Sequence, residues 1–279
     1  MAIRVFAPAK VNLTLHVTGR RADGYHLLDS LVVFADVGDV VTAVEGKGLT
    51  LEVTGPEAGG VPAGESNSIL QAARFMGVDD VALTLEKHLP TAAGIGGGTA
   101  DAAAALRAIA QLRGVDVPAD VLPLGADVPV CLRGRAVRMS GIGEELTDVG
   151  GFPDVWVILV NPRVGVSTPE VFKRLQHKDN APMPDQIPVF KTVRDLAGWL
   201  ADQRNDLEAA AIEVQPKVAE VLVALRRVKG QLLTRMSGSG ATCFVLFGDE
   251  QSAKAAAQGI SAQHPDWWVR NTRLGGKNL

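Results

Sequence analysis

The sequence has little cysteine, no long apolar run and no excess of one charge. Its 279 residues include 2 cysteines, too few for a disulfide framework or a cysteine-rich zinc site. Its 28 basic and 31 acidic side chains give a net charge of −3, which argues against a nucleic-acid-binding or polybasic membrane-binding protein. The clearest apolar run, 155–160, has the length of a strand. We therefore expect a soluble, cytoplasmic protein that binds neither nucleic acid nor membranes. The partner expected is a small-molecule substrate, and the chain is expected to be a monomer or a homodimer.

Tyrosine is nearly absent, whereas 30 glycines make glycine abundant, and the glycines cluster in two loops at 94–98 and 237–240. The first loop runs into an alanine-rich segment, 100–112, which predicts a helix that ends at Gly114. Free amides and the helix dipole at such a junction favour a phosphate. Neither the Walker pattern nor G-x-G-x-x-G is present, so the residues alone fit a phosphate loop or a flexible turn about equally. The second loop fits a hairpin turn.

The periodicity predicts an α+β protein with a boundary near 148–153. Residues 11–17 alternate between apolar and polar, which predicts one half-buried strand. The other elements expected before the boundary are strands at 27–34, 40–44, 49–53 and 81–85 and a helix at 66–76. Those expected after it are strands at 155–160, 232–236, 242–247 and 267–270 and helices at 169–176, 216–228 and 250–262. The second half thus has the β-α-β-β-α-β order of a ferredoxin-like domain with added helices.

Three segments, 8–13, 89–102 and 237–242, resemble in order and spacing the three motifs of the GHMP kinases. The resemblance extends from about residue 3 to about residue 248. It implies a two-domain α+β fold and an ATP-dependent small-molecule kinase, with magnesium bound together with ATP. The implied domains are an N-terminal, ribosomal-protein-like ATP-binding and catalytic domain at 1–152 and a C-terminal ferredoxin-like domain at 153–279, with the site between them.

Finer features at 19–26, 124–129 and 205–208 are similar to one branch of this family. The resemblance implies phosphorylation of the 2-hydroxyl of a cytidine-diphosphate-linked methylerythritol, on the non-mevalonate route to isopentenyl diphosphate. Two other functions stay open at this point. One is a GHMP kinase for another small alcohol, of the homoserine or mevalonate type, and the other is a nucleotide-binding module without catalysis.

Asp127 and Lys10 are the catalytic candidates. The hydroxyl that attacks a γ-phosphoryl group must lose its proton, and a carboxylate can accept it. From the residues alone, Asp127 fits a turn aspartate before Pro129 better, and its match to the family's catalytic aspartate reverses that preference. A lysine beside the base can offset charge on the reacting groups, although a lysine at Lys10 would ordinarily be exposed.

Asn12, Tyr25 and His26 are the substrate-binding candidates. Asn12 shares a strand face with Lys10 by the period of two, so both side chains can enter one cleft. An aromatic ring such as Tyr25 can stack on a cytosine base, and an imidazole such as His26 can hydrogen-bond its edge. Without the resemblance these three are an exposed strand residue, a loop tyrosine and a surface histidine. The family also places a second aromatic residue against the base, which the sequence leaves unassigned.

The ATP-binding candidates come from the glycine loops and the segment at 66–69. Thr99 could touch a phosphate or cap the helix, and Asn67 could lie beside the adenine or cap a helix. Asp101 could be an acid favoured by the helix dipole, or could orient Lys10 or a metal-bound water. No side chain is expected to be a metal ligand, because the phosphates supply much of the magnesium coordination. The ATP-binding candidates are Pro90, Ala93, Gly94, Ile95, Gly96, Gly97, Gly98, Thr99, Asn67, Gly238 and Ser239.

Overall fold

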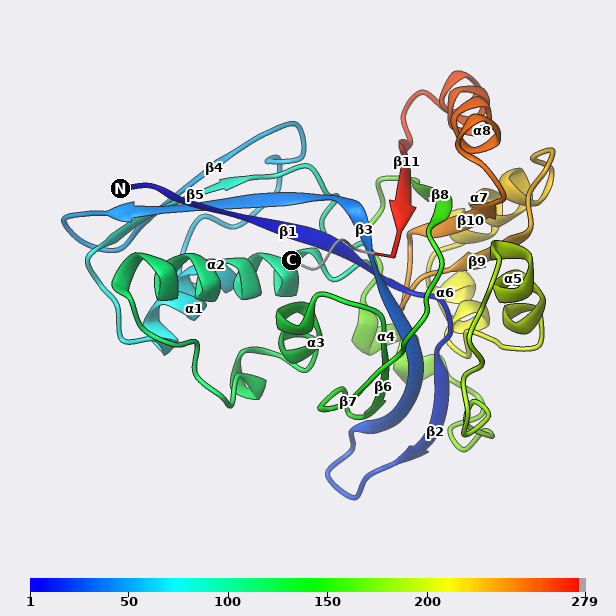
Figure 1. Cartoon of the computed structure of the whole chain (residues 1–279), viewed down its shortest axis with the longest axis horizontal. Coiled ribbons are helices and arrows are strands. Elements are labelled where there is room, and N and C mark those ends of the chain that lie inside the picture. The colour runs from blue at the N-terminus through cyan, green and yellow to red at the C-terminus, as the bar shows by residue number, and fades with distance from the viewer. Residues whose placement is uncertain (276–279) are drawn as a thin grey trace.

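The computed structural model describes residues 1–275, and the last four residues of the second predicted domain lie outside this part. Its strands form one connected sheet with the order β4-β5-β3-β11-β8-β10-β9, in which β1, β2 and β6 also pair with β3, and β7 pairs with β6. Figure 1 shows α1 and α2 on one side of the β1–β3–β5 region, and α5 to α8 around the other end of the molecule. None of the helices described is both long and apolar enough to span a membrane.

The bounds of the elements are as follows. The strands are β1 Ile3–Asn12, β2 His16–Arg20, β3 His26–Glu45, β4 Thr50–Thr54, β5 Val81–Glu86, β6 Val137–Gly141, β7 Glu145–Asp148, β8 Val155–Asn161, β9 Leu233–Met236, β10 Cys243–Phe247 and β11 Trp268–Leu274. The helices are α1 Ser68–Phe75, α2 Gly97–Arg113, the 3-10 helix η1 Leu122–Leu124, α3 Val128–Arg133, α4 Thr168–Arg174, α5 Val193–Ala201, α6 Glu208–Val214, α7 Lys217–Arg226 and α8 Glu250–Gln263.

The alanines of α2 are all buried, and they let this helix lie close against β1 and β3. The core beneath α2 also receives α1 and the inward side chains of β5, which alternate along that strand. A left-handed Gly114 ends α2, as the sequence predicts. This packing fixes the N-terminus of α2, the end that faces the candidate site.

In the C-terminal half, β11, β8, β10 and β9 lie side by side in that order, and every neighbouring pair is antiparallel. This is the sheet of a split β-α-β-β-α-β unit, with α5 to α7 inserted before β9. The α+β fold class predicted from the sequence is therefore confirmed.

The two halves share a hydrophobic core. Val11 and Leu31 from the first strands pack in one buried cluster with Val157, Phe244 and Trp268 from the C-terminal sheet. The long β3 also pairs with β11 near its middle. A loop joins β7 to β8 at the predicted boundary segment, and the division into 1–152 and 153–279 stays a prediction.

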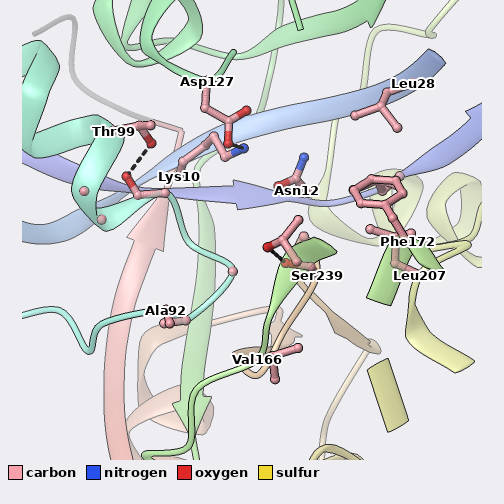
Figure 2. Close-up of a pocket in the computed structure, with 18 of the residues that line it drawn as sticks. Lys10, Asn12, Leu28, Ala92, Thr99, Asp127, Val166, Phe172, Leu207 and Ser239 are labelled. Carbon is pink, nitrogen blue, oxygen red and sulfur yellow. Dashed lines mark hydrogen bonds and ion pairs between the residues drawn. The ribbon is translucent and has the colours of Figure 1, made fainter. Parts of the chain in front are cut away.

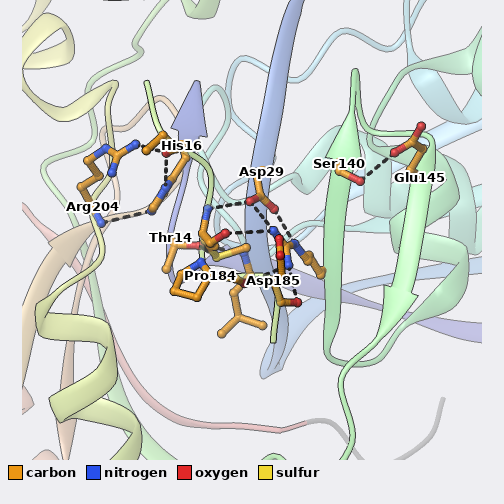
Figure 3. A network of polar contacts seen from close by, with 12 residues as sticks. Thr14, His16, Asp29, Ser140, Glu145, Pro184, Asp185 and Arg204 are labelled. Atoms are coloured by element: carbon orange, nitrogen blue, oxygen red, sulfur yellow. Dashed lines mark hydrogen bonds and ion pairs between the residues drawn. The ribbon is translucent and has the colours of Figure 1, made fainter. Parts of the chain in front are cut away.

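The prediction of one half-buried strand at 11–17 is wrong. The chain forms two strands, β1 and β2, and the polar side chains of Lys10, Asn12, Thr14 and His16 are as buried as the apolar ones between them. Lys10 and Asn12 contact the two glycine loops, and a segment of the C-terminal half, 181–185, covers Thr14 and His16. Figure 3 shows how this segment is held by hydrogen bonds to the first strands and to their neighbour β6.

The predicted strands at 27–34 and 40–44 are one strand, β3, because residues 35–39 stay extended beside β1. Gly38 permits this close approach, since a Cβ there would lie 2.2 Å from the carbonyl oxygen of Ala7. The helix α3 and the hairpin of β6 and β7 were not predicted at all.

Candidate active site

The glycine loop at 94–98 ends in α2, which begins at Gly97 and not at residue 100 as predicted. Gly96 precedes the helix in a left-handed conformation, with φ of 65°, and makes no side-chain capping bond. The amides of Gly97, Gly98 and Thr99 therefore stand in the first turn, where helix geometry leaves them without a partner inside the helix. Amides in this position can bind phosphate oxygens.

Lys10 passes beneath this loop. Its backbone N–H donates to the carbonyl of Ile95 at 2.9 Å, and a Cβ on Gly96 would lie 3.1 Å from the Cβ of Lys10. The glycine at 96 thus leaves room for the lysine side chain. The Lys10 side chain is only 5% exposed, and its Nζ lies 2.7 Å from Oδ2 of Asp127.

Asp127 stands immediately before α3, at the position where an aspartate usually caps a helix. Its carboxylate makes no capping bond and is turned instead to Lys10. The side chain is 36% exposed, in contrast to the buried lysine. The interpretation of Asp127 as a simple turn residue therefore does not account for its contact with Lys10, which Figure 2 shows.

The second glycine loop packs directly on the first. Ser237 Oγ donates to the carbonyl of Gly94 at 3.0 Å, and the N–H of Thr242 donates to the carbonyl of Ala93 at 3.0 Å. A Cβ on Gly94 would lie 2.6 Å from two carbonyl oxygens of the second loop, and one on Gly238 would lie 2.7 Å from the Gly94 carbonyl. Glycine is required at both positions because the two backbones touch.

The segment 205–208 holds the second loop in place. The side-chain amide of Asn205 donates to the carbonyls of Met236 and Gly238, at 2.9 Å each, and Glu208 accepts the N–H of Met236 at 3.1 Å. Asp206 accepts the N–H of Val17 at 2.7 Å. Asn205, Asp206 and Glu208 join the loop to β2 and do not line the cleft.

A cavity of about 490 Å³ lies over the two loops, and we call it the glycine-loop cavity. Figure 2 shows Lys10, Asp127 and Thr99 on one side of it and Phe172 with Leu207 on another. Its lining residues are Lys10, Asn12, Leu15, Leu28, Ser68, Ala92, Ala93, Gly94, Gly96, Gly97, Gly98, Thr99, Asp127, Met139, Val166, Thr168, Phe172, Leu207, Gly238 and Ser239.

A second cavity of about 820 Å³ adjoins the first, and we call it the aromatic cavity. It contains both predicted base-binding residues together with three basic side chains. Its lining residues are Arg20, Asp23, Gly24, Tyr25, His26, Leu28, Thr99, Ala126, Asp127, Ile142, Thr168, Pro169, Phe172, Lys173 and Lys178. The two cavities share Leu28, Thr99, Asp127, Thr168 and Phe172. Asp127 therefore lies where they meet.

Phe172 on α4 is an aromatic residue of this cavity that the sequence analysis did not single out. Its ring stacks on the imidazole of His26, with centroids 4.7 Å apart and an interplanar angle of 19°. Tyr25 lines the same cavity and is 60% exposed. Burial, and then the charges of Arg20 and Lys178, lower the pKa of His26 below 6.5, so its ring is neutral at neutral pH. Its buried Nε2 has no partner among the described residues.

Asn12 also has an unused buried atom. Its amide nitrogen donates to Ser30 Oγ at 2.8 Å, whereas its Oδ1 finds no partner among residues 1–275. The side chain lines the glycine-loop cavity beside Gly238. A ligand donor in that cavity would satisfy this oxygen, since buried polar atoms are nearly always hydrogen-bonded.

Several predicted residues lie elsewhere. Pro90, Ile95 and Asn67 do not line either cavity, and Asn67 caps α1, with Oδ1 accepting the N–H of Ile69 at 2.8 Å. Thr99 is not the helix cap, because it lies inside α2 and its hydroxyl donates to the carbonyl of Gly96 at 2.8 Å. Asp101 does not orient Lys10. It pairs with Lys87 at 2.9 Å instead.

The residues that the sequence missed are side chains brought in from distant segments. Ser68 donates to the carbonyl of Gly98 at 2.7 Å, and Thr168 shares a hydrogen bond of 2.7 Å with Ser239. One feature of the sequence could have identified Phe172. It is an aromatic residue on a short helix, next to the buried residues Val171 and Leu175. No group of three or more metal-ligating side chains occurs within residues 1–275.

Family models match both halves of the chain. The model of the GHMP kinases N terminal domain matches residues 67–135, and the GHMP kinases C terminal model matches residues 187–266. Among solved structures, a crystal structure of 4-(cytidine 5'-diphospho)-2C-methyl-D-erythritol kinase has a TM-score of 0.79 and 32% identity, covering 98% of this chain and 100% of that chain. A homoserine kinase from Cytophaga hutchinsonii shares the fold at a TM-score of 0.67 and 20% identity, covering 99% of this chain and 96% of that one.

Curated relatives are similar over nearly the whole chain. The 4-diphosphocytidyl-2-C-methyl-D-erythritol kinase of Cereibacter sphaeroides is 59% identical over 274 residues, which are 97% of this chain and 99% of that protein. The kinase of the same name from Dinoroseobacter shibae is 58% identical over 269 residues, covering 96% of this chain and 94% of that protein. The chain therefore belongs to the GHMP kinases and, among them, to the family of the 4-diphosphocytidyl-2-C-methyl-D-erythritol kinases.

Proposed function

We propose that this protein transfers the γ-phosphoryl group of ATP to the 2-hydroxyl of 4-diphosphocytidyl-2-C-methyl-D-erythritol, giving the 2-phosphate and ADP. The observation that carries the proposal is the position of Asp127, paired with Lys10 at the point where the two cavities meet. A phosphoryl donor on one side and an acceptor alcohol on the other would meet at this carboxylate. The names and high identity of the relatives support the choice of acceptor.

The glycine-loop cavity suits the phosphates of ATP. Its floor is the first turn of α2, whose free amides and dipole favour anions. Gly98 also lines this cavity, and a Cβ built there would make only an ordinary contact, at 3.7 Å from Ser68 Oγ. Lys10 adds a buried positive charge beside Asp127. We assign the triphosphate to this cavity, with the second glycine loop as its opposite wall.

The aromatic cavity suits a cytidine diphosphate. Tyr25 and Phe172 offer ring faces, and the free Nε2 of the neutral His26 can hydrogen-bond the edge of a pyrimidine. Arg20 and Lys178 line the same cavity and suit the two phosphates of the diphosphate group. A substrate without a nucleotide would leave these groups unused, which disfavours an alcohol of the homoserine or mevalonate type.

The chemical step needs few groups from the protein. The hydroxyl oxygen attacks the γ-phosphorus, the bond between that phosphorus and the ADP oxygen breaks, and Asp127 accepts the hydroxyl proton. The Lys10 ammonium stabilises negative charge that develops around the transferred group. A module that only binds a nucleotide requires no such carboxylate and lysine pair.

Magnesium is expected to enter with ATP and to neutralise part of the phosphate charge, with the phosphates as its main ligands. The cytoplasmic location and the monomeric or homodimeric state stay predictions.

The direct test is ADP release with ATP and 4-diphosphocytidyl-2-C-methyl-D-erythritol, measured against mevalonate and homoserine as acceptors. We expect release with the cytidine compound alone. Release with mevalonate or homoserine and none with the cytidine compound would overturn the proposal.

A further inference from the structure

Beneath the glycine loop lies a buried charge cluster that the proposed reaction does not use. Lys87 Nζ forms ion pairs with Asp39 and with Asp101, the latter at 2.9 Å. The three side chains are 3%, 0% and 4% exposed, in the order Lys87, Asp39 and Asp101. With both acids ionised, one ammonium faces two carboxylates, which leaves a buried net charge of one negative unit. Burying an unbalanced charge is costly, and a carboxyl group can relieve it by binding a proton.

The two carboxylates are not equivalent. Asp39 Oδ1 accepts the N–H groups of His88 and Leu89, at 2.6 and 2.8 Å, while its other oxygen faces Lys87. Asp101 has Lys87 as its one partner, and its buried Oδ1 has none within residues 1–275. Hydrogen bonds to the ionised form favour ionisation. Asp39 is therefore the acid that stays ionised, and Asp101 is the acid that can bind a proton.

The electrostatics agree with this assignment. Burial raises the pKa of Asp101 to about 7. The positive charge of Lys87 lowers this pKa, and the negative charge of Asp39 raises it. The same Lys87 keeps its ammonium charge, because the two carboxylates outweigh its burial and raise its pKa.

Lys87 and Asp39 are the charged groups that shift the pKa of Asp101 most, and other ionisable groups come from the elements packed on α2. From β1 comes Lys10, which is paired with Asp127, and from α3 comes Cys131, whose thiol is uncharged because burial raises its pKa to about 12. The charged residue on α1, Arg74, is paired with Glu65 at the surface.

The cluster lies directly under the proposed phosphate site. Lys87 Nζ is 3.2 Å from the point where a Cβ on Gly97 would stand, and Gly97 lines the glycine-loop cavity. Asp101 follows Gly97 by one helical turn. Phosphates bound at this turn would add negative charge beside a cluster that is already negative. A nearby like charge favours the neutral form of a carboxyl group.

We propose that Asp101 takes up a proton when the triphosphate occupies the glycine-loop cavity, and that the resulting neutral cluster keeps Lys87 positioned under the first turn of α2. This inference rests on the proposed function, because it assumes ATP in that cavity. Lys87 and Asp101 act here as positioning residues, through the backbone of the turn, and neither touches the reacting atoms. The proton that Asp101 takes up accompanies ATP binding, whereas the proton that Asp127 accepts comes from the acceptor hydroxyl.

The test counts protons by titration calorimetry of ATP with Mg²⁺, without acceptor, at pH 7.5 in two buffers of different ionisation enthalpy. We expect the wild-type protein to take up about half a proton more per nucleotide than Asp101→Asn, since the pKa passes from below to above the working pH. Protons that the nucleotide itself gains or loses on binding are the same in both proteins, so they drop out of the difference between wild type and Asp101→Asn. Asp116→Asn, which alters an exposed carboxyl group in the loop after α2, is the matched control and should behave as wild type.

Equal proton counts for wild type and Asp101→Asn, with ATP bound by both, would overturn this inference and leave the proposed function intact. A wild-type protein that does not bind ATP would contradict the proposed function itself. Because binding takes up a proton, wild-type affinity for ATP should fall several-fold from pH 6.5 to 8.5, and that of Asp101→Asn should fall less.

A second measurement does not depend on the folding of a variant. The infrared difference spectrum of the wild-type protein with and without ATP should gain the carbonyl stretch of a protonated carboxyl group. Its absence at pH 7.5 would overturn the inference.

Discussion

The two cavities that meet at Asp127 are built in different ways. The glycine-loop cavity is walled largely by backbone and by small residues from two loops that touch each other. The aromatic cavity is walled by rings and long basic side chains from the end of β2, the loop to β3 and the start of β3, and from α4 with the segment after it. Backbone amides recognise phosphates that many ligands share, whereas side chains recognise one ligand. We infer that the first cavity serves the common donor and the second selects the acceptor.

The largest effect should come from the residue that the cavities share. Asp127→Ala removes the group that accepts the hydroxyl proton, so kcat should fall about 100-fold or more while both KM values change little. Steady-state kinetics with each substrate varied in turn measure this. The exposed Asp179→Ala is the control. A loss of tenfold or less in a folded protein would reduce Asp127 to a positioning role.

Replacing a glycine at the contact of the two loops should affect stability. A Cβ on Gly94 would lie 2.6 Å from the carbonyl oxygens of Ser237 and Gly240, at a φ of +71°. We expect Gly94→Ala to lower the free energy of unfolding by about 2–4 kcal/mol, from overpacking and backbone strain. Urea denaturation checks this against Gly98→Ala, whose Cβ meets no atom closer than 3.7 Å. Equal stabilities for the two variants would show that the loops do not need to touch.

Phe172→Ala should affect the acceptor side alone. Without this ring the base loses one stacking surface, and stacking on an aromatic side chain is worth about 1–3 kcal/mol. We expect KM for the cytidine substrate to rise about tenfold, with KM for ATP nearly constant. A similar rise in both KM values would mean that Phe172 supports the shape of both cavities and does not bind the base specifically.

The smallest expected effect concerns the charge of the aromatic cavity. Burial lowers the pKa of His26, and Arg20 and Lys178 lower it further. Lys178→Met removes one of these charges, so the His26 pKa should move up, toward 6.5, in an NMR titration of the imidazoles. The pKa of His16, which burial and Arg204 lower, should stay in place. An unchanged His26 pKa would mean that Lys178 lies too far from the imidazole to affect it.

This difference in construction also explains what the sequence could predict. The glycine loop, the alanine helix and the Lys10 segment are contiguous patterns, and their arrangement follows from helix and strand periodicity together with the family resemblance. The partner of Asp101 is only 14 residues away, but periodicity within a helix or strand does not predict how the intervening loop folds back. The position of Phe172 depends on a contact with His26, which lies far away in the chain. The burial of Thr14 and His16 was missed for the same reason, since it depends on the segment 181–185, more than 160 residues away.

The central claim is that one cavity holds the donor and the other the acceptor. It is tested most directly by KM for both substrates in two variants, Gly98→Ala on the first cavity and Phe172→Ala on the second. The account predicts a crossed result, because the Gly98→Ala methyl group would project over the phosphate-binding turn. Gly98→Ala should raise KM for ATP alone, and Phe172→Ala should raise KM for the cytidine substrate alone. If both variants raise the same KM, or each raises both equally, the division of the two cavities between donor and acceptor is contradicted.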